Sequence, residues 1–296
     1  MDLKRYLRER IELIDSSLHN YLPPKELRPQ RLHEAMHYSM FAGGKRIRPV
    51  LMLAACEAVG GNLQAALPAA CALEMIHTYS LIHDDLPAMD DDDFRRGKPT
   101  NHRVYGEALA ILAGDALLTE AFVLLTDPKV RGPVAQEVVC KVVQQMSRAA
   151  GARGMVGGQV VDIESEGKCI SLDELEYIHR HKTGALISAA LEIGGLIGGA
   201  DDPAMAALQE YGQSAGLAFQ VADDILDIVG DQQELGKDVG SDQARGKATY
   251  PALMGLDGAR EYADQLNQRA LTALEPLGEA AAPLREIARY IVARTS

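Results

Sequence analysis

Two short clusters of aspartates stand out in this sequence. Between Ile82 and His102 the chain reads IHDDLPAMDDDDFRRGKPTNH, which places six aspartates within ten residues, and a second cluster, QVADDILD, follows about 140 residues later. Neighbouring carboxylates repel one another, so a chain selected for stability alone would spread them apart. A solvated acidic loop is the plain interpretation of such a run. The recurrence of the pattern favours a site for a hard cation instead, an oxygen site of the kind that Mg²⁺ prefers.

Helical periodicity predicts how the carboxylates of each cluster are arranged. Asp223 and Asp227 are four residues apart, so on a helix they lie on one face, one turn from each other. Asp84 and Asp90 would lie on different faces of a regular helix, but Pro87 interrupts the helix and would let Asp90 return beside Asp84. Mg²⁺ is usually held by one or two carboxylates together with substrate phosphates. The alternative for the second cluster is an ordinary exposed pair on an amphipathic helix.

Basic residues occur in five short packets that accompany the acidic clusters. They are GGKRIRP with Lys45, Arg46 and Arg48, RRGK with Arg95 and Arg96, RHKTG with Lys182, GKD with Lys237, and GKATYP with Lys247. Guanidinium and ammonium groups bind phosphate oxygens through charge-assisted hydrogen bonds. A solvated turn is the alternative for any single packet. Five packets on a chain of formal net charge -12 predict a cavity that binds diphosphates.

Almost every periodic segment of the chain is helical. Helices are expected over residues 27–44, 48–61, 62–85, 105–126, 133–150, 172–198, 204–230, 247–257, 259–275 and 280–294. Apolar residues on most faces of 62–85 predict a buried central helix. No segment alternates apolar and polar residues over five or more positions, as a strand would, and no Pro-, Gly- or Ser-rich linker divides the chain. The expected fold is all-α, a single domain over residues 1–296 with roughly ten or more helices around a central cavity.

Composition argues against several classes of partner and location. The net charge of -12 and a pI near 5.1 disfavour a nucleic-acid partner, which would require a broad basic surface. Four cysteines without a CxxC motif indicate a reducing, cytoplasmic setting. The most membrane-like segment, Thr183 to Ala200, is interrupted by Glu192 and is rich in small residues, so no membrane span is expected.

The motifs together resemble a known family. With GEALAILAGDAL, GMVGGQVVDI, HKTGALI, LGKDVGSDQARGKATYP and the closing YIVAR, the chain is similar over nearly its whole length to the trans-prenyltransferases, the isoprenyl diphosphate synthases, and most closely to bacterial farnesyl diphosphate synthases. The resemblance implies condensation of isopentenyl diphosphate with dimethylallyl or geranyl diphosphate to give farnesyl diphosphate. It also implies a homodimer that uses three Mg²⁺ ions per active site, with Mn²⁺ as an alternative metal.

The resemblance also implies a role for each motif residue. Two Mg²⁺ ions are expected at Asp84, Asp85 and Asp90, and a third at Asp223, with support from Asp224 and Asp227. The allylic diphosphate is expected at Arg95, Lys182 and Lys237, with Lys247 nearby. The diphosphate of isopentenyl diphosphate is expected at Lys45, Arg48, His77 and Arg96, and the reacting carbons at Thr183 and Gln220. Many relatives close the site with a basic tail, whereas this chain ends in Arg294, Thr295 and Ser296.

Product length is expected to depend on two residues that precede the first acidic cluster. Tyr79 and Ser80 lie five and four residues before Asp84, so on a helix they are about 7.5 and 6 Å deeper than its carboxylate. A bulky tyrosine at that depth predicts a cavity that closes after three isoprene units. The alternatives are that Tyr79 is only a core aromatic, and that the product is geranylgeranyl (C20) or geranyl (C10) diphosphate.

Two rival functions are less consistent with the sequence. Terpene cyclases steer their cations with many aromatic faces, but this chain has no Trp, four Phe and 5% aromatic residues. A cyclase with one substrate would also not need both DDILD and GGKRIRP. A non-catalytic partner subunit would be expected to have lost one acidic motif, and both are present here.

Overall fold

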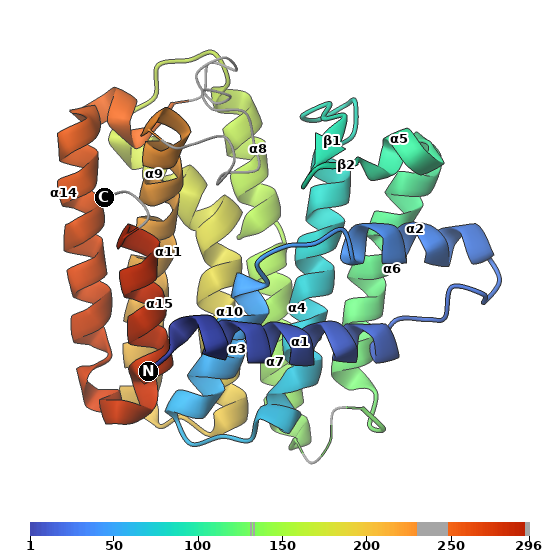
Figure 1. The fold of residues 1–296 in the computed structure, drawn as a ribbon, viewed down its shortest axis with the longest axis horizontal. Coiled ribbons are helices and arrows are strands. Elements are labelled where there is room, and N and C mark those ends of the chain that lie inside the picture. The colour runs from blue at the N-terminus through green and yellow to red at the C-terminus, as the bar shows by residue number, and fades with distance from the viewer. Residues whose placement is uncertain (131, 133, 230–247, 294–296) are drawn as a thin grey trace.

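The fold is a bundle of helices, seen in a computed structural model that describes residues 1–130, 132, 134–229 and 248–293 (Figure 1). The first half contains α1 (Leu3–Tyr21), α2 (Gln30–Met40), α3 (Ile47–Ala58), α4 (Leu63–Asp84), α5 (Asn101–Tyr105), α6 (Glu107–Thr126), α7 (Gln136–Ala150) and α8 (Met155–Ser165). The second half contains α9 (Leu172–His179), η1 (Arg180–Gly184), α10 (Ala185–Gly198), α11 (Asp202–Val229), α14 (Tyr250–Ala273), η2 (Glu275–Ala281) and α15 (Ala282–Ala293). The predicted all-α class is confirmed.

Three features of the described elements differ from the sequence expectation. The segment expected as one helix over 172–198 is α9, a π-helix (η1) and α10. The helices expected over 247–257 and 259–275 are the single element α14, which is interrupted by Gly255 at φ 76°. A two-residue antiparallel hairpin, β1 (Phe94–Arg95) with β2 (Lys98–Pro99), follows the first acidic cluster and was not anticipated.

Helix α4 is the central helix of the bundle, as predicted. The Asn62 side chain accepts a hydrogen bond from the Gln64 N–H and so caps the start of the helix. Most of its residues are buried, and α1, α3, α6 and α10 all pack against it. The helix ends at Asp84 because Pro87 follows closely. The first acidic cluster therefore lies at this end of the helix.

The segment that looked most membrane-like in sequence is a core helix. Gly194 and Gly198 of α10 lie against α3, where an added Cβ would come within 2.2 Å of Met52 O and 2.4 Å of Val59 Cγ2. Small residues therefore permit this close helix contact, as expected. By length and composition alone, two other helices are apolar enough to cross a membrane. The apolar 18-residue stretch of α4 is 78% buried inside the bundle, and that of α6 is 39% buried.

A buried ion network fixes the loop that carries the first basic packet. Arg46 lies at the start of α3 with φ 47°, and it is 4% exposed. Its guanidinium donates to Glu74 Oε1 at 2.8 Å, to Asp15 Oδ1 at 2.9 Å and to Met40 O at 2.6 Å. The two carboxylates differ in environment, because the Glu74 side chain is 2% exposed and that of Asp15 is 39% exposed. Arg46 is therefore an anchor of the loop and not a free phosphate ligand.

This network predicts a large loss of stability in the variant Glu74→Gln. The substitution would leave the Arg46 guanidinium buried without its main counter-charge, which should lower the free energy of unfolding by about 3 kcal/mol. Urea denaturation followed by circular dichroism would measure the loss. Asp15→Asn is the matched control, because its half-exposed carboxylate should contribute less. Equal stability of both variants and the wild type would show that the network does not stabilise the fold.

Candidate active site

The chain turns back on itself directly after α4 and brings two carboxylates together. The Asp90 N–H donates to Asp84 O at 2.9 Å, and the Asp91 N–H donates to Leu86 O at 3.1 Å. Pro87 lies inside this turn, so the break it was expected to cause does return Asp90 to the end of the helix. The result is a pair of acidic side chains, Asp84 and Asp90, from one short segment.

The electrostatic environment of this pair favours a cation. Burial raises the pKa of Asp84 to about 6, and the neighbouring charge of Asp90 acts in the same direction while the Lys182 ammonium opposes it. A cation between the carboxylates would relieve this repulsion. Over residues 1–130, 132, 134–229 and 248–293, no three His, Cys, Asp or Glu side chains converge to hold a metal ion alone. A metal held by two carboxylates and completed by substrate phosphates is the arrangement that Mg²⁺ favours.

Asp85 is engaged differently from its two neighbours in the motif. It is 3% exposed, and its Oδ1 accepts a hydrogen bond from Arg95 Nε at 2.7 Å. Arg95 Nη2 lies 2.5 Å from the same oxygen and 3.7 Å from Asp92 Oδ2. Asp85 therefore holds the Arg95 guanidinium beside the acidic pair.

The β1–β2 hairpin joins two of the basic packets. Its two-residue turn, Arg96–Gly97, has φ 54° and 73°, the positive values that a type I′ hairpin requires. In this conformation Arg96 Nη1 donates a hydrogen bond to Gly43 O in the GGKRIRP loop. Gly44 makes the approach possible, because an added Cβ there would lie 2.6 Å from Arg96 Nη1. The sequence pattern indicates both packets by their charge but does not predict this direct contact between them.

Arg48 and His77 form a second basic contact beside the hairpin. Arg48 Nη1 lies 3.2 Å from His77 Nε2. Since a guanidinium can only donate, Nε2 accepts and His77 is neutral. Burial and the surrounding arginines lower the pKa of His77 well below its ordinary value, which agrees with this assignment. Lys45 is exposed on the same loop, so all four residues expected at the isopentenyl diphosphate group lie in this region.

Lys182 lies opposite the first acidic pair, on the π-helix η1. Its Nζ is 2.6 Å from Asp162 Oδ2 of α8. Burial lowers the pKa of Lys182, but Asp162, Asp84 and Asp90 together hold it above the ordinary value. Gly158 allows α8 to approach, because an added Cβ would lie 2.2 Å from Lys182 N. Asp162 was missed in the sequence, although its spacing of four from Gly158 in GGQVVD was the available signal.

The carboxylates of the second cluster lie on α11, and they differ in burial and in their neighbours. Asp223 is half-buried. Burial lowers the pKa of Arg48, and the charge of Asp223 is among those that oppose this shift. Asp224 is 6% exposed, and its Oδ2 accepts the N–H of Tyr250 at 3.0 Å, at the first residue of α14. Asp227 is also buried. Asp223 is thus within electrostatic reach of the basic contact, while Asp224 fixes the start of α14.

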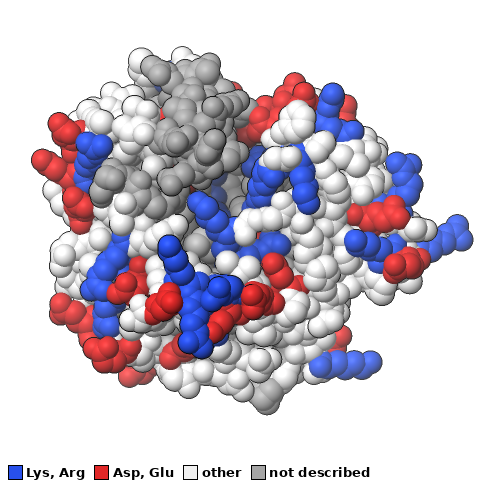
Figure 2. Space-filling view, in the orientation of Figure 1, with Lys and Arg blue, Asp and Glu red and all other residues white. Residues whose placement is uncertain are grey.

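The remaining expected site residues fall in two groups. Thr183 on η1 and Gln220 on α11 are both half-buried, beside Lys182 and Asp223 in the chain. Lys237, Lys247 and Arg294 lie outside the described residues. Figure 2 shows Lys and Arg side chains on both sides of a hollow at the centre of one face, with acidic side chains beside the hairpin.

Known proteins are similar to this chain in sequence and in fold. A model of the polyprenyl synthetase family matches residues 29–281. The chain is 52% identical over 261 residues to the farnesyl diphosphate synthase of Geobacillus stearothermophilus, covering 88% of this chain and 87% of that one. It is 49% identical over 299 residues to the heterodimeric geranylgeranyl pyrophosphate synthase large subunit 1, chloroplastic, of Arabidopsis thaliana, covering 99% and 80%. The crystal structure of an FPP/GFPP synthase from Zymomonas mobilis, 39% identical, superposes with a TM-score of 0.87 over 98% of this chain and 99% of that one.

The names of these relatives divide between farnesyl and longer products. These similarities establish that the reaction is prenyl transfer, and they do not establish the chain length of its product. Members of the family are generally Mg²⁺-dependent, which agrees with the paired carboxylates found here. The chain belongs to the polyprenyl synthetase family, and its reaction is prenyl transfer in isoprenoid biosynthesis.

Proposed function

We propose that the protein is a Mg²⁺-dependent farnesyl diphosphate synthase that adds isopentenyl diphosphate twice, first to dimethylallyl and then to geranyl diphosphate. The observation that carries this proposal is the arrangement along α4. The acidic pair lies at the end of the helix, the His77–Arg48 contact lies two turns before it, and the buried Tyr79 lies between them. The four cysteines carry free thiols, which supports a cytoplasmic location, and the whole of residues 1–296 would act as one domain.

The allylic substrate would bind at the acidic pair. Asp84, Asp90 and Asp223 would hold Mg²⁺ together with the substrate diphosphate, and Arg95 and Lys182 would bind the same diphosphate from the opposite side. Bound Mg²⁺ supplies positive charge that stabilises the departing diphosphate. Lys237 and Lys247 are assigned to this group from the sequence alone.

The chain's own residues would assist the reaction by charge and by position. Arg95 and Lys182 are fixed by Asp85 and Asp162, so they face the leaving group without reorganisation as negative charge develops on it. Cleavage of the allylic C–O bond gives a carbocation, and the double bond of isopentenyl diphosphate attacks it to form the new C–C bond. The attack leaves a new carbocation, which loses a proton to the released pyrophosphate and so forms the double bond of the product.

The second substrate would bind at the basic contact. Lys45, Arg48, His77 and Arg96 would hold the diphosphate of isopentenyl diphosphate, and Arg96 is already aligned by Gly43 O. Thr183 and Gln220 would face the reacting carbons between the two diphosphates. This division assigns each basic group to one substrate.

The division predicts that two alanine variants each weaken the binding of a different substrate. Arg48→Ala should raise KM for isopentenyl diphosphate, and Lys182→Ala should raise KM for the allylic diphosphate. Each loses a charge-assisted contact of about 1.5–3 kcal/mol, which is roughly a 10- to 150-fold change. Steady-state kinetics with each substrate varied in turn would separate them. Arg103→Ala, which removes an exposed arginine paired with Asp93, is the control and should change neither KM. If both site variants weakened the same substrate, the division would be wrong.

Tyr79 supports the proposed product length. The side chain is 7% exposed, and its ring meets that of His83 edge-on at 5.6 Å. Burial and then the charge of Asp84 raise the pKa of the Tyr79 phenol, so the ring is within electrostatic reach of the acidic pair. Ser80 is half-buried one turn before Asp84, and its hydroxyl donates to His77 O at 2.9 Å. A hydrocarbon tail whose diphosphate is held at Asp84 would meet this level of α4 as it grows.

The variant Tyr79→Ala should therefore lengthen the product. Removing the ring would open the cavity, and the main product should shift from 15 carbons to 20 or more. Chromatography of the dephosphorylated products would measure the shift. Tyr79→Phe is the matched control, since it keeps the ring and should still give a C15 product. A C15 product from Tyr79→Ala would mean that the tyrosine is only a core aromatic.

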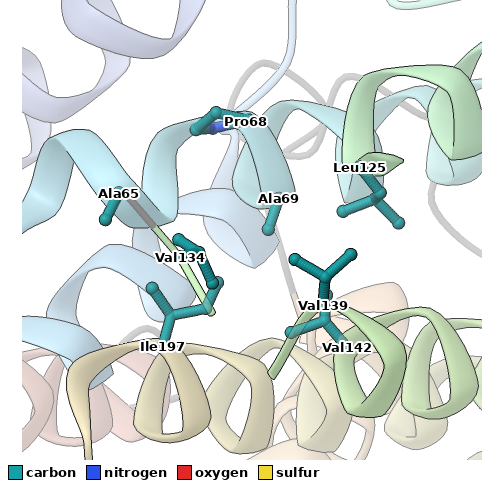
Figure 3. Close-up of a pocket in the computed structure, with 8 residues that line it drawn as sticks. All are labelled: Ala65, Pro68, Ala69, Leu125, Val134, Val139, Val142 and Ile197. Atoms are coloured by element: carbon teal, nitrogen blue, oxygen red, sulfur yellow. The ribbon is translucent and has the colours of Figure 1, made fainter. Parts of the chain in front are cut away.

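A small apolar pocket at the far end of α4 offers no competing site for the tail. It is lined by Ala65, Pro68, Ala69, Leu125, Val134, Val139, Val142 and Ile197 (Figure 3). Its volume is about 20 Å³, which is close to that of a single water site. Ala69 lies 15 residues before Asp84, or roughly 22 Å along the helix, three times deeper than Tyr79. The stop at Tyr79 would be reached long before this pocket.

A homodimer is part of the proposal and is supported by α6. Most residues of this helix are apolar, and three of them are largely exposed. The exposed fractions of Ile111, Leu112 and Val123 are 43%, 55% and 54%. An apolar helix face of this kind is typical of a subunit interface. Sedimentation equilibrium should give twice the chain mass of 32.0 kDa, and a monomer mass would remove this part of the proposal.

A further inference from the structure

A second cleft lies behind the π-helix that carries Lys182. It has a volume of about 490 Å³, within the range of small-molecule sites. From η1 and the start of α10 it is lined by Arg180, His181, Gly184 and Ala185, whereas Lys182 and Thr183 do not line it. The π-helix therefore presents one face to the acidic pair and another to this cleft.

The opposite walls of the cleft come from α7, α10 and α11. The helices contribute Gln145, Arg148, Ala149, Ser188, Glu192, Gln213 and Leu217, and the turn between α7 and α8 contributes Arg153. The lining is mixed, with small apolar residues beside amide, hydroxyl and guanidinium groups. Such a surface suits a ligand that has a charged group and a compact organic body.

The charge of the cleft is unusual for this acidic chain. Three of its lining residues are arginines, and Glu192 is the one carboxylate among the lining residues. Within the part of the chain that the structure describes, neither Arg148 nor Arg153 pairs with a carboxylate, and both are exposed. Arg180 is held by Glu176 at 3.1 Å, and the Glu192 carboxylate accepts from Gln209 Nε2 at 3.1 Å. Two arginines therefore remain available to a ligand.

His181 also lines the cleft, and its ring is held by Tyr177. His181 Nδ1 lies 2.7 Å from Tyr177 O, and because a carbonyl only accepts, Nδ1 carries the proton. The His181 ring stacks on Tyr177 at 3.9 Å, which fixes its orientation at the edge of the cleft. Planar guanidinium groups bind phosphate oxygens in bidentate geometry, which ammonium groups cannot do.

We propose that this cleft is a second binding site, separate from the active site, for a small ligand that bears a phosphate or diphosphate group. Its arginines would bind the anionic group, while Ala149, Ala185 and Leu217 would contact the rest of the ligand. The site is coupled to catalysis by η1, since Arg180, His181 and Gly184 flank Lys182 in the same π-helix. π-helical turns are rare and are frequently found at functional sites. A ligand that shifts η1 would change KM for the allylic substrate.

Binding to the cleft can be measured without turnover. Inorganic phosphate, inorganic pyrophosphate and farnesyl diphosphate would each be titrated by calorimetry into the full chain, as the wild type and as the double variant Arg148→Gln/Arg153→Gln. The active site is intact in both proteins, so the difference between them reports the cleft. With at least one probe, the wild type should bind one more equivalent per chain than the variant, or bind it at least tenfold more tightly. Tighter binding of farnesyl diphosphate than of pyrophosphate to the cleft, taken as the difference between wild type and variant, would identify a prenyl diphosphate as the ligand, and equal binding would identify the phosphate group alone.

Two further measurements keep the test independent of folding defects and of the proposed function. Glu192→Gln removes the one carboxylate of the cleft and should tighten binding of the same probe. Without added ligand, the double variant should have the kcat and KM of the wild type. With added ligand, KM for the allylic substrate should change more in the wild type than in the double variant. Identical titrations of the wild type, the double variant and Glu192→Gln with all three probes would overturn the proposal. Because binding is read directly, this result would not depend on which prenyl product forms.

Discussion

Replacing Asp84 with alanine should lower kcat/KM for prenyl transfer by at least about 100-fold. The carboxylate lies at the end of α4, beside Asp90 and opposite Lys182, at the point where the allylic diphosphate is proposed to leave. Its loss would remove a metal ligand and so weaken the stabilisation of charge on the leaving group. The side chain is half-buried and its pKa is raised by burial, so the variant should remain folded.

A neighbouring aspartate provides the control for this variant. Asp91 belongs to the same acidic run but is exposed, with φ 52°, a conformation that asparagine also tolerates. Asp91→Asn removes the same charge and should retain nearly full activity. Kinetics with labelled isopentenyl diphosphate, together with circular dichroism of each variant, would make the comparison. Equal losses in the two variants would show that the run acts only through its total charge.

Removing divalent metal should abolish turnover but should not abolish binding of one substrate. The acidic pair cannot hold a diphosphate without a cation, because both groups are negatively charged. The contact between Arg48 and His77, with Arg96 beside it, is itself cationic. Calorimetry in EDTA should therefore still detect isopentenyl diphosphate, while the allylic substrate binds weakly, and added Mg²⁺ should restore turnover. Undiminished turnover in EDTA would contradict the assignment of Asp84, Asp90 and Asp223 to metal.

The features that sequence could predict are mostly local. The return of Asp90 to Asp84 follows from the position of Pro87 and the period of a helix. The burial of α4 follows from apolar residues on most of its faces. The packing of α10 against α3 follows from glycines such as Gly194. In each case the residues that decide the structure are close together in the chain.

The features that sequence missed depend on contacts between distant segments. The π-helix η1 lies inside a segment with an ordinary helical pattern, and it forms where α8 packs against it through Gly158 and Asp162. Likewise Arg46, which belongs to a packet of basic residues, is buried and paired with Asp15 and Glu74 from two other helices. Charge and spacing indicate that such residues matter, but their partners are set by tertiary packing, which local patterns do not encode.

The proposed function as a whole depends on two successive condensations that stop at 15 carbons. The most direct measurement is a time course of the wild-type protein with labelled isopentenyl diphosphate, dimethylallyl diphosphate and Mg²⁺, with the dephosphorylated products separated by chain length. A C10 product should appear first and decline as a C15 product accumulates and then stays constant. A final product of C10 or of C20, or no condensation at all, would contradict the proposal that this chain is a farnesyl diphosphate synthase.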